Sequence, residues 1–226
     1  MGRWGYRLFE STQDLQIVVD LGHTFNERPM RLFQMVCLAG LSLSERTRLP
    51  VRASQHQTEV DQATLSQTVT TIRNQFDTGL GDRFFEKHRA NEKSHDDKYR
   101  VILAGALMMR VGARIKPEHL QHIRELVPQV MCTCPLTPPN LDLGFRRPGR
   151  AQLLAALDNY VAGTPRDFQE PSCFACGRIQ VDLGFSLKTC GRCERAWYCS
   201  AECQRAQWDD HKKGCLPPDQ AKTFDV

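Results

Sequence analysis

The chain has 226 residues, of which 41% are apolar and 25% are charged, a balance typical of a soluble globular protein. Its formal net charge of +4 is too small to indicate nucleic-acid binding without a clustered basic surface. No apolar run approaches the roughly 20 residues that a membrane-spanning helix needs. The opening residues, Met-Gly-Arg-Trp-Gly-Tyr, lack the apolar core of a signal peptide, so we expect a reducing compartment.

The N-terminal quarter of the chain gives mixed signals. Residues 15–20 contain a β-branched run and predict either a short strand or the start of a helix. Pro29 begins an apolar run with the spacing of a buried helix, and Pro50 closes it. Cys37 lies in this run, and we interpret it as a core thiol and not as a metal ligand.

The next segment predicts an amphipathic helix followed by a charged stretch. Residues 57–77 carry apolar side chains at intervals of three to five positions, and the pair of Gly79 and Gly81 is expected to end this helix. Residues 83–100 then interleave charges of both signs. That pattern favours a solvated helix face or an exposed loop over a binding surface.

His95 and Asp97 within this stretch match His-x-Asp, the first half of a non-haem iron triad. The later histidines that would complete the triad, His119 and His122, lie on an expected helix with no alternating strands around it. The sequence therefore does not favour an iron site. His119 and His122 are spaced three apart, as in some metal sites, but no third ligand is evident, so we expect them to be solvated.

Two further helices are predicted in the middle of the chain. Residues 99–115 form a largely apolar run and predict a mostly buried helix. A second helix is expected to start at Pro117, which suits a first helical turn, and Glu118 there complements the helix dipole. Pro128 is expected to end or kink it.

A proline-rich break near residues 132–148 follows these helices. Its Cys-x-Cys pair, Cys132 and Cys134, is a poor zinc chelate, and we interpret both thiols as structural or spare. Residues 153–161 then predict one more amphipathic helix. The fold is therefore expected to be mainly α.

Seven cysteines and one histidine crowd the C-terminal part of the chain. They form two Cys-x2-Cys pairs, then Cys-x3-Cys, then His-x3-Cys, which suffices for two tetrahedral zinc sites. A disulfide framework is the alternative, but an odd number of thiols completed by a histidine favours metal. We expect two Zn²⁺ ions as cofactors. The eight candidate ligands are Cys173, Cys176, Cys190, Cys193, Cys199, Cys203, His211 and Cys215.

This segment resembles a MYND-type zinc finger over about a fifth of the chain. The resemblance implies a cross-braced arrangement in which the first and third ligand pairs share one ion, and the second and fourth share the other; spacing alone does not decide between this and a sequential arrangement. A short hairpin strand within residues 179–185 and a helix over 201–208 are also expected. The matching residues are 173–176 (Cys-Phe-Ala-Cys), 190–193 (Cys-Gly-Arg-Cys), 197–204 (Trp-Tyr-Cys-Ser-Ala-Glu-Cys-Gln), Trp208 and 211–215 (His-Lys-Lys-Gly-Cys).

All eight ligands are protein groups, so we expect structural zinc with no open position for water or substrate. The resemblance implies that such fingers bind proline-rich peptides of partner proteins, often corepressors, at the positions of Gln204 and Trp208. An extended proline segment loses little entropy when it packs on an exposed indole. The alternative is that Trp208 only covers the zinc core. Gly191 departs from some peptide-binding members of the family, which carry serine there.

The leading hypothesis is a non-enzymatic, regulatory or transcription-associated adaptor of the nucleus or the cytoplasm. A SET-type lysine methyltransferase or a fragment of one is the alternative, although the expected glycine-rich cofactor segment and Asn-His-Ser-Cys stretch do not occur in the sequence. A RING-type ubiquitin ligase fits poorly, because the only histidine among the eight candidate ligands is the seventh, which is not the usual RING order. Direct DNA binding is disfavoured by a finger charge of only +2, seven basic minus five acidic residues.

The expected domain organisation follows from these signals. A helical domain spans residues 1–165, a polar linker spans 166–172, the finger spans 173–215 and a tail spans 216–226. A finger of this size buries too little apolar surface to fold alone, so the metal ions must supply most of its folding free energy.

Overall fold

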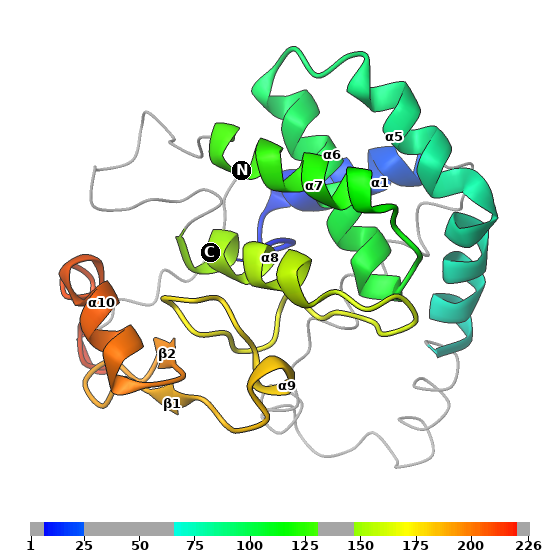
Figure 1. The fold of residues 1–226 in the computed structure, drawn as a ribbon. Helices are drawn as coiled ribbons and strands as arrows, with labels where there is room; N and C mark the ends of the chain where they lie inside the picture. Colours follow the sequence, from blue (N-terminus) through cyan, green and yellow to red (C-terminus); the bar gives the residue numbers. More distant parts are fainter. Residues whose placement is uncertain (1–6, 25–65, 131–146, 221–226) are drawn as a thin grey trace, which may run out of the picture.

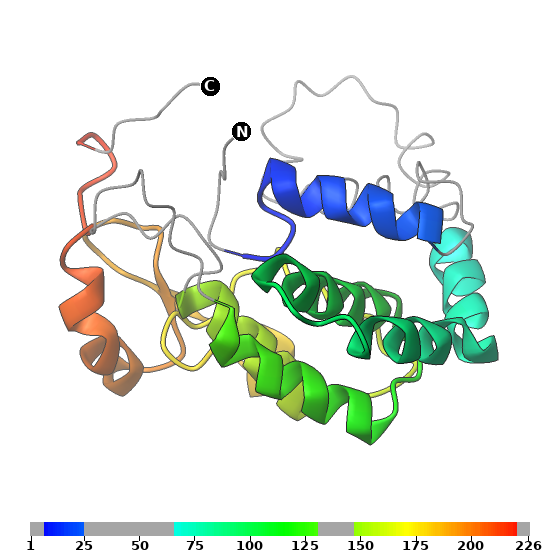
Figure 2. The same ribbon diagram turned by 90° about the horizontal axis from the view of Figure 1, so that it is seen from above.

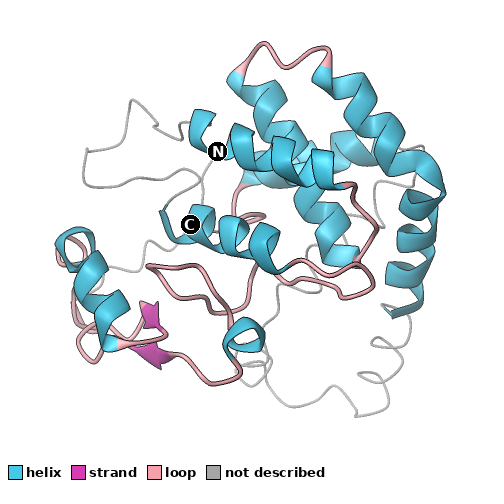
Figure 3. Ribbon diagram, viewed as in Figure 1, coloured by secondary structure: helices cyan, strands magenta, loops and turns pink. Residues whose placement is uncertain are grey.

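The structure is a computed structural model that describes residues 7–24, 66–130 and 147–220. It is mainly α-helical, as the sequence predicts (Figure 3). Most helices gather in one body, and a smaller unit that contains the two strands and the last helix lies beside it (Figures 1 and 2). None of the described helices is both long enough and apolar enough to cross a membrane.

Helix α6, His95–Val111, is the centre of the helical body. It begins with a reciprocal capping box, in which the Ser94 hydroxyl accepts from the Asp97 amide and the Asp97 carboxylate accepts from the Ser94 amide, both at 3.1 Å. It ends at Gly112, whose φ of 73° lies in the left-handed region. Every side chain from residue 101 to 111 is buried, so other elements surround this helix.

Helix α1, Thr12–Thr24, packs against α6 and resolves the ambiguity over residues 15–20 in favour of a helix. The Ser11 hydroxyl caps its first turn by accepting from the Asp14 amide at 2.9 Å. The Tyr99 hydroxyl donates to the buried Asp14 carboxylate at 2.7 Å and so links the two helices. One apolar face of the helix is turned to the core, and its buried members are Ile17, Val18 and Leu21.

The helix over residues 66–75 is interrupted at the two glycines, as the sequence predicts. A π-helical turn, η1 (Phe76–Leu80), joins it to the next helix, α5 (Gly81–Arg89). Gly79 has a φ of 101°, which is not a helical conformation, and it makes a kink between the two helices. A Cβ at Gly81 would lie 2.3 Å from the terminal methyl carbon of Met108, so Gly81 permits close packing on α6.

Helix α7 (Pro117–Leu126) starts at the predicted proline, and the short 3-10 helix η2 (Val127–Gln129) follows it. Gly105 of α6 lets α7 approach closely, since a Cβ there would lie 2.3 Å from the Cδ1 atom of Ile123. Helix α8, Arg147–Asn159, packs against α7 and covers most of the last amphipathic segment that the sequence predicts, ending two residues before its predicted end.

The prediction that His119 and His122 are solvated is wrong. The His119 side chain is buried and stacks on Phe85 with 4.3 Å between ring centroids. His122 places Nε2 2.6 Å from a carboxylate oxygen of Glu92, and both side chains are largely buried. The two histidines thus have separate partners and do not share a metal site.

Residues 160–172 return across the helical body and pack against it. The amide of Gly163 donates to the Gly112 carbonyl at 2.8 Å, and the amide of Arg166 donates to the Met109 carbonyl at 3.0 Å. Phe168 is buried in the core, with its ring 6.3 Å from that of Phe9. The segment that the sequence predicts as a linker is therefore anchored to the core, close to the finger.

The finger contains four short elements. They are α9 (Gln180–Leu183), β1 (Lys188–Thr189), β2 (Trp197–Tyr198) and α10 (Ala201–His211), with β1 antiparallel to β2. The strand expected within residues 179–185 is wrong, because α9 occupies that segment and ends at Gly184 with a φ of 74°. The hairpin forms later, and α10 extends beyond the predicted end.

Some sequence-based interpretations lie outside the described residues. They are the helix expected between Pro29 and Pro50, the core role of Cys37, the proline-rich break and its cysteines Cys132 and Cys134, and the end of the tail.

Candidate metal centres and the surface they support

The first metal-ligand group joins Cys173, Cys176, Cys199 and Cys203, whose sulfur atoms all lie within 4.8 Å of one another. Cys173 and Cys176 lie in a tight turn in which the Gly177 amide donates to the Cys173 carbonyl at 2.8 Å. Cys203 lies in the first turn of α10, where the Ser200 hydroxyl accepts from its amide at 3.2 Å. Capping of α10 by Ser200 thus also positions a ligand.

The second group joins Cys190, Cys193, His211 and Cys215, with ligand atoms again within 4.8 Å. The Cys193 sulfur lies 3.6 Å from Nε2 of His211, and the Cys190 sulfur lies 3.8 Å from that of Cys215. The turn between the first two cysteines closes with a hydrogen bond of 2.9 Å from the Glu194 amide to the Cys190 carbonyl.

Both groups fit Zn²⁺ in donor type and in spacing. Zinc–sulfur bonds of about 2.3 Å in a tetrahedron place two sulfurs about 3.8 Å apart. The closest sulfur pairs here are separated by 3.4, 3.7 and 3.8 Å. All seven cysteines of the two ligand groups are free thiols, so no disulfide competes for these ligands. The donor sets and their spacing support two Zn²⁺ ions.

The pKa values of the thiols also favour a bound cation. Burial raises the pKa of Cys190, but the amides of Cys193 and Arg192, together with the side chains of His211 and Cys215, lower the pKa to about 6. Burial and the neighbouring Cys190 together raise the pKa of Cys215 to about 11. One thiolate thus forms readily while its neighbour resists ionisation, and a divalent cation in the group would offset that repulsion.

The grouping is cross-braced, because each group takes ligands from two separated parts of the segment. Helix α10 contributes to both, with Cys203 in the first group and His211 in the second. In the hairpin, β1 directly precedes Cys190 of the second group and β2 directly precedes Cys199 of the first. Loss of either ion would therefore release elements that the other ion also holds.

Gln204 and Trp208 lie one turn apart on α10, and we call them the Trp208 surface. The Trp208 side chain is 39% exposed, with its ring 5.8 Å from that of His211. Tyr198 is the buried aromatic residue here, and its hydroxyl donates to the Gln207 side chain at 2.6 Å. Gly191 faces open space, so a serine would fit there without a steric clash.

Three residues that the sequence reasoning did not single out hold the finger against the helical body. A Cβ at Gly177 would lie 1.9 Å from the Ala151 carbonyl oxygen, so the first ligand turn directly contacts the backbone of α8. Arg166 donates from both terminal nitrogens to the two carboxylate oxygens of Asp182, each at 2.6 Å. No local pattern signals these contacts, because their partners are distant in sequence.

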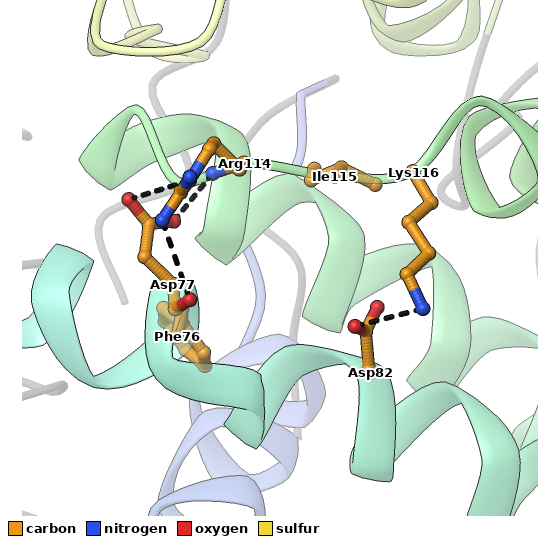
Figure 4. A pocket seen from close by; sticks show the side chains of 6 residues that line it. All are labelled: Phe76, Asp77, Asp82, Arg114, Ile115 and Lys116. Carbon is orange, nitrogen blue, oxygen red and sulfur yellow. Dashed lines mark hydrogen bonds and ion pairs between the residues drawn. The ribbon is translucent and has the colours of Figure 1, made fainter.

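A pocket of about 290 Å³ lies in the helical body, where it is lined by residues of η1, of α5 and of the segment after α6 (Figure 4). Its two carboxylates are already paired, Asp77 with Arg114 at 3.5 Å and Asp82 with Lys116 at 2.9 Å. The Asp77 carboxylate also accepts from the Arg114 amide at 2.6 Å. These pairs join the segment between α6 and α7 to η1 and to α5, which is a structural role.

Comparison with known proteins identifies the cysteine-rich segment. The MYND finger family matches residues 173–215. N-lysine methyltransferase SMYD2 of Bos taurus is 55% identical over 31 residues, and that of Homo sapiens is 52% identical over 31 residues. SET domain-containing protein 14 of Caenorhabditis elegans is 41% identical over 56 residues.

These matches are short. The two SMYD2 matches cover 14% of this chain and 7% of each relative, and the nematode match covers 25% and 12%. The chain thus spans only a small part of the length of these relatives. No solved structure matches the chain. The family match and the two four-ligand groups agree over the same residues, and residues 173–215 are a MYND finger, a zinc-binding protein-interaction module.

Proposed function

We propose that this protein is a non-enzymatic adaptor whose MYND finger binds proline-rich segments of partner proteins at the Trp208 surface. The observation that carries the proposal is the position of Trp208, a large aromatic side chain that is 39% exposed on a helix fixed by both ligand groups. Tyr198 is buried, and its ring and that of Trp208 both lie near the ring of His211. The indole is therefore available to a partner.

The physical chemistry of this surface suits an extended proline segment. Such a segment is already restricted in solution, so it loses little conformational entropy on binding. Its flat pyrrolidine rings pack well on an indole, and the Gln204 amide offers hydrogen bonds to its carbonyls. The natural partners would be regulatory, corepressor-like proteins of the nucleus or the cytoplasm.

The non-enzymatic part of the proposal rests on the metal groups. Each group holds four protein ligands, which fill a tetrahedral ion and leave no coordination position for a substrate or a catalytic water. The zinc would act by holding the Trp208 surface in place.

A second candidate is a protein that works with, or forms part of, a lysine methyltransferase. The relatives named as N-lysine methyltransferases favour it, although their similarity covers little more than the finger. A methyltransferase assay with S-adenosylmethionine separates the two candidates. Turnover by the isolated chain would overturn the adaptor proposal.

The direct test is an affinity capture from cell extract with three forms of the full chain. They are the unchanged protein, a Gln204→Ala/Trp208→Ala variant and a Phe185→Ala control. Phe185 is 53% exposed on the finger but lies outside α10, so the control also removes an exposed aromatic ring. We expect proline-rich partners to bind the unchanged protein and the control only. Equal capture by all three forms would contradict the proposal.

A further inference from the structure

The basic side chains of α10 and of the two lysines that follow it are already paired. Each lies three residues after a carboxylate of α10 and forms an ion pair with it on the exposed face. These pairs leave residues 201–213 with little uncompensated charge. They are Arg205 with Glu202 at 2.8 Å, Lys212 with Asp209 at 2.5 Å and Lys213 with Asp210 at 3.4 Å.

The hairpin differs, because its cations have no such partners. Lys188 lies on β1, and Arg192 and Arg195 lie in the turn between β1 and β2; we call these three the hairpin cations. All three are exposed, and none forms an ion pair or a side-chain hydrogen bond with any residue in the described ranges. The hairpin has one acidic residue, Glu194, so its net charge is +2, three minus one. The excess positive charge of the finger is therefore on the hairpin.

The hairpin that carries these cations is joined to the Trp208 surface through the second metal-ligand group. Arg192 directly precedes Cys193, whose sulfur is 3.6 Å from Nε2 of His211, and the His211 ring is 5.8 Å from that of Trp208. Lys188 pairs with Tyr198, which is hydrogen-bonded to α10. Figure 1 shows the hairpin beside α10. A peptide on Trp208 would thus have these cations at its edge.

We propose that the peptide bound at the Trp208 surface carries acidic residues beside its proline-rich core, and that these pair with Lys188, Arg192 and Arg195. The inference rests on the proposed function, because it specifies the ligand of the same surface. Uncompensated charge at the rim of an interface selects partners of opposite charge and speeds their association. Each exposed pair contributes modestly, so the effect comes from three cations acting together.

Nucleic acid is a poorer fit to the same charges. Binding to a phosphate backbone depends on many simultaneous contacts, and this patch offers three cations beside a helix whose own cations are paired. An exposed tryptophan at the edge of a small basic patch suits a peptide that combines proline and acidic residues.

The test uses three fluorescent synthetic peptides that share one proline-rich core. Their flanks are two glutamates, two glycines or two lysines on each side, and binding to the zinc-loaded full chain is followed by anisotropy. We expect the glutamate-flanked peptide to bind about threefold to thirtyfold more tightly than the lysine-flanked one. Added salt should reduce this difference.

Charge reversal of the hairpin cations should invert the order. The variant is Lys188→Glu/Arg192→Glu/Arg195→Glu. The matched control, Arg83→Glu/Lys87→Glu/Arg89→Glu, changes the net charge equally at three exposed cations of α5, which lies far from the finger in both views (Figures 1 and 2). The control should keep the preference for glutamate. Zinc content confirms that each variant is folded, and if the hairpin variant loses zinc, the peptide order on the unchanged chain decides.

The outcomes separate the two proposals. If the three peptides bind equally and Trp208→Ala abolishes binding, the charge inference is wrong and the proposed function stands. If no peptide binds the unchanged chain, both fail. If a duplex oligonucleotide binds more tightly than the glutamate-flanked peptide, and does so without Trp208 but not without the hairpin cations, the cations serve nucleic acid and the inference is overturned.

Discussion

Arg166 and Asp182 form a bidentate ion pair that joins residues 160–172, which pack on the helical body, to the finger. Both terminal nitrogens of Arg166 lie 2.6 Å from the carboxylate oxygens, and the side chains are 9% and 3% exposed. The same carboxylate accepts from the Ile179 amide at 3.1 Å. This geometry makes the finger part of the folded body and fixes its orientation.

Replacing Arg166 with methionine should destabilise the protein by about 3–5 kcal/mol, because it leaves a buried carboxylate without its counter-charge. The zinc content should stay at two ions per chain, since neither residue is a ligand. Urea unfolding at saturating zinc measures the loss. A double variant, Arg166→Met/Asp182→Asn, should recover part of it, and a loss below about 0.5 kcal/mol in the single variant would contradict the role of the pair.

Gly177→Ala should separate the finger from α8. A methyl group there would lie 1.9 Å from the Ala151 carbonyl oxygen, and Gly177 also has a φ of 77°. Gly184→Ala is the matched control, since its φ is 74° and nothing lies within 4 Å of its Cβ. We expect the control to show only the backbone cost of about 1 kcal/mol. Equal unfolding free energies for the two variants would show that the contact with α8 contributes nothing.

Glu170 should make the protein less stable as the pH rises. Burial is the main cause that raises the pKa of Glu170 from 4.5 to about 7. The negative charges of Asp167 and Asp182 add to this effect, and Arg166 opposes it. Between those values the folded state binds more protons than the unfolded state. The contribution of Glu170 to stability therefore falls as the pH rises through this window and is lowest above it.

Glu170→Gln should accordingly stabilise the protein by about 1–3 kcal/mol at pH 8 and by roughly half as much at pH 5.5. Urea unfolding of the variant and of the unchanged protein at both pH values measures the difference, so any common effect of pH on zinc binding cancels. A gain that is equal at both pH values would show that ionisation of Glu170 is not its source.

Cys190→Ser should cost more than one zinc ion. It removes a ligand from the second group, and the cross-brace through α10 and the hairpin then loosens the first group as well. We expect less than one zinc ion per chain, with proteolytic cleavage of the finger. Cys132→Ser, outside the finger, serves as the thiol control. A variant that retained two ions and full protease resistance would refute the cross-braced account.

Local sequence patterns predicted the elements whose causes are local. The proline at the start of α7 and the apolar run of α6 gave correct helices, because capping and burial there depend on neighbouring residues. Ligand spacing predicted the metal groups for the same reason, since a Cys-x2-Cys turn brings two sulfurs together whatever surrounds it. The cross-braced grouping came from the family resemblance and agrees with the structure.

Features that depend on distant partners could not be predicted. The sequence did not indicate that Gly81 packs against α6, where Met108 occupies the space that a side chain at Gly81 would need. The sequence predicted that His119 is solvated, because nothing near it in the chain indicates that Phe85 of α5 stacks on its ring. Likewise, residues 166–172 have the composition of a linker, and only the fold reveals that Phe168 enters the core.

The most direct test of peptide binding at the Trp208 surface maps a proline-rich peptide onto the zinc-loaded full chain by amide chemical-shift changes. We expect the chemical-shift changes to concentrate on Gln204, Trp208 and the adjacent hairpin. We also expect Trp208→Ala to weaken peptide binding about tenfold or more while both zinc ions remain bound. Changes confined to the helical body, or unaltered affinity in the Trp208→Ala variant, would contradict peptide binding at this surface.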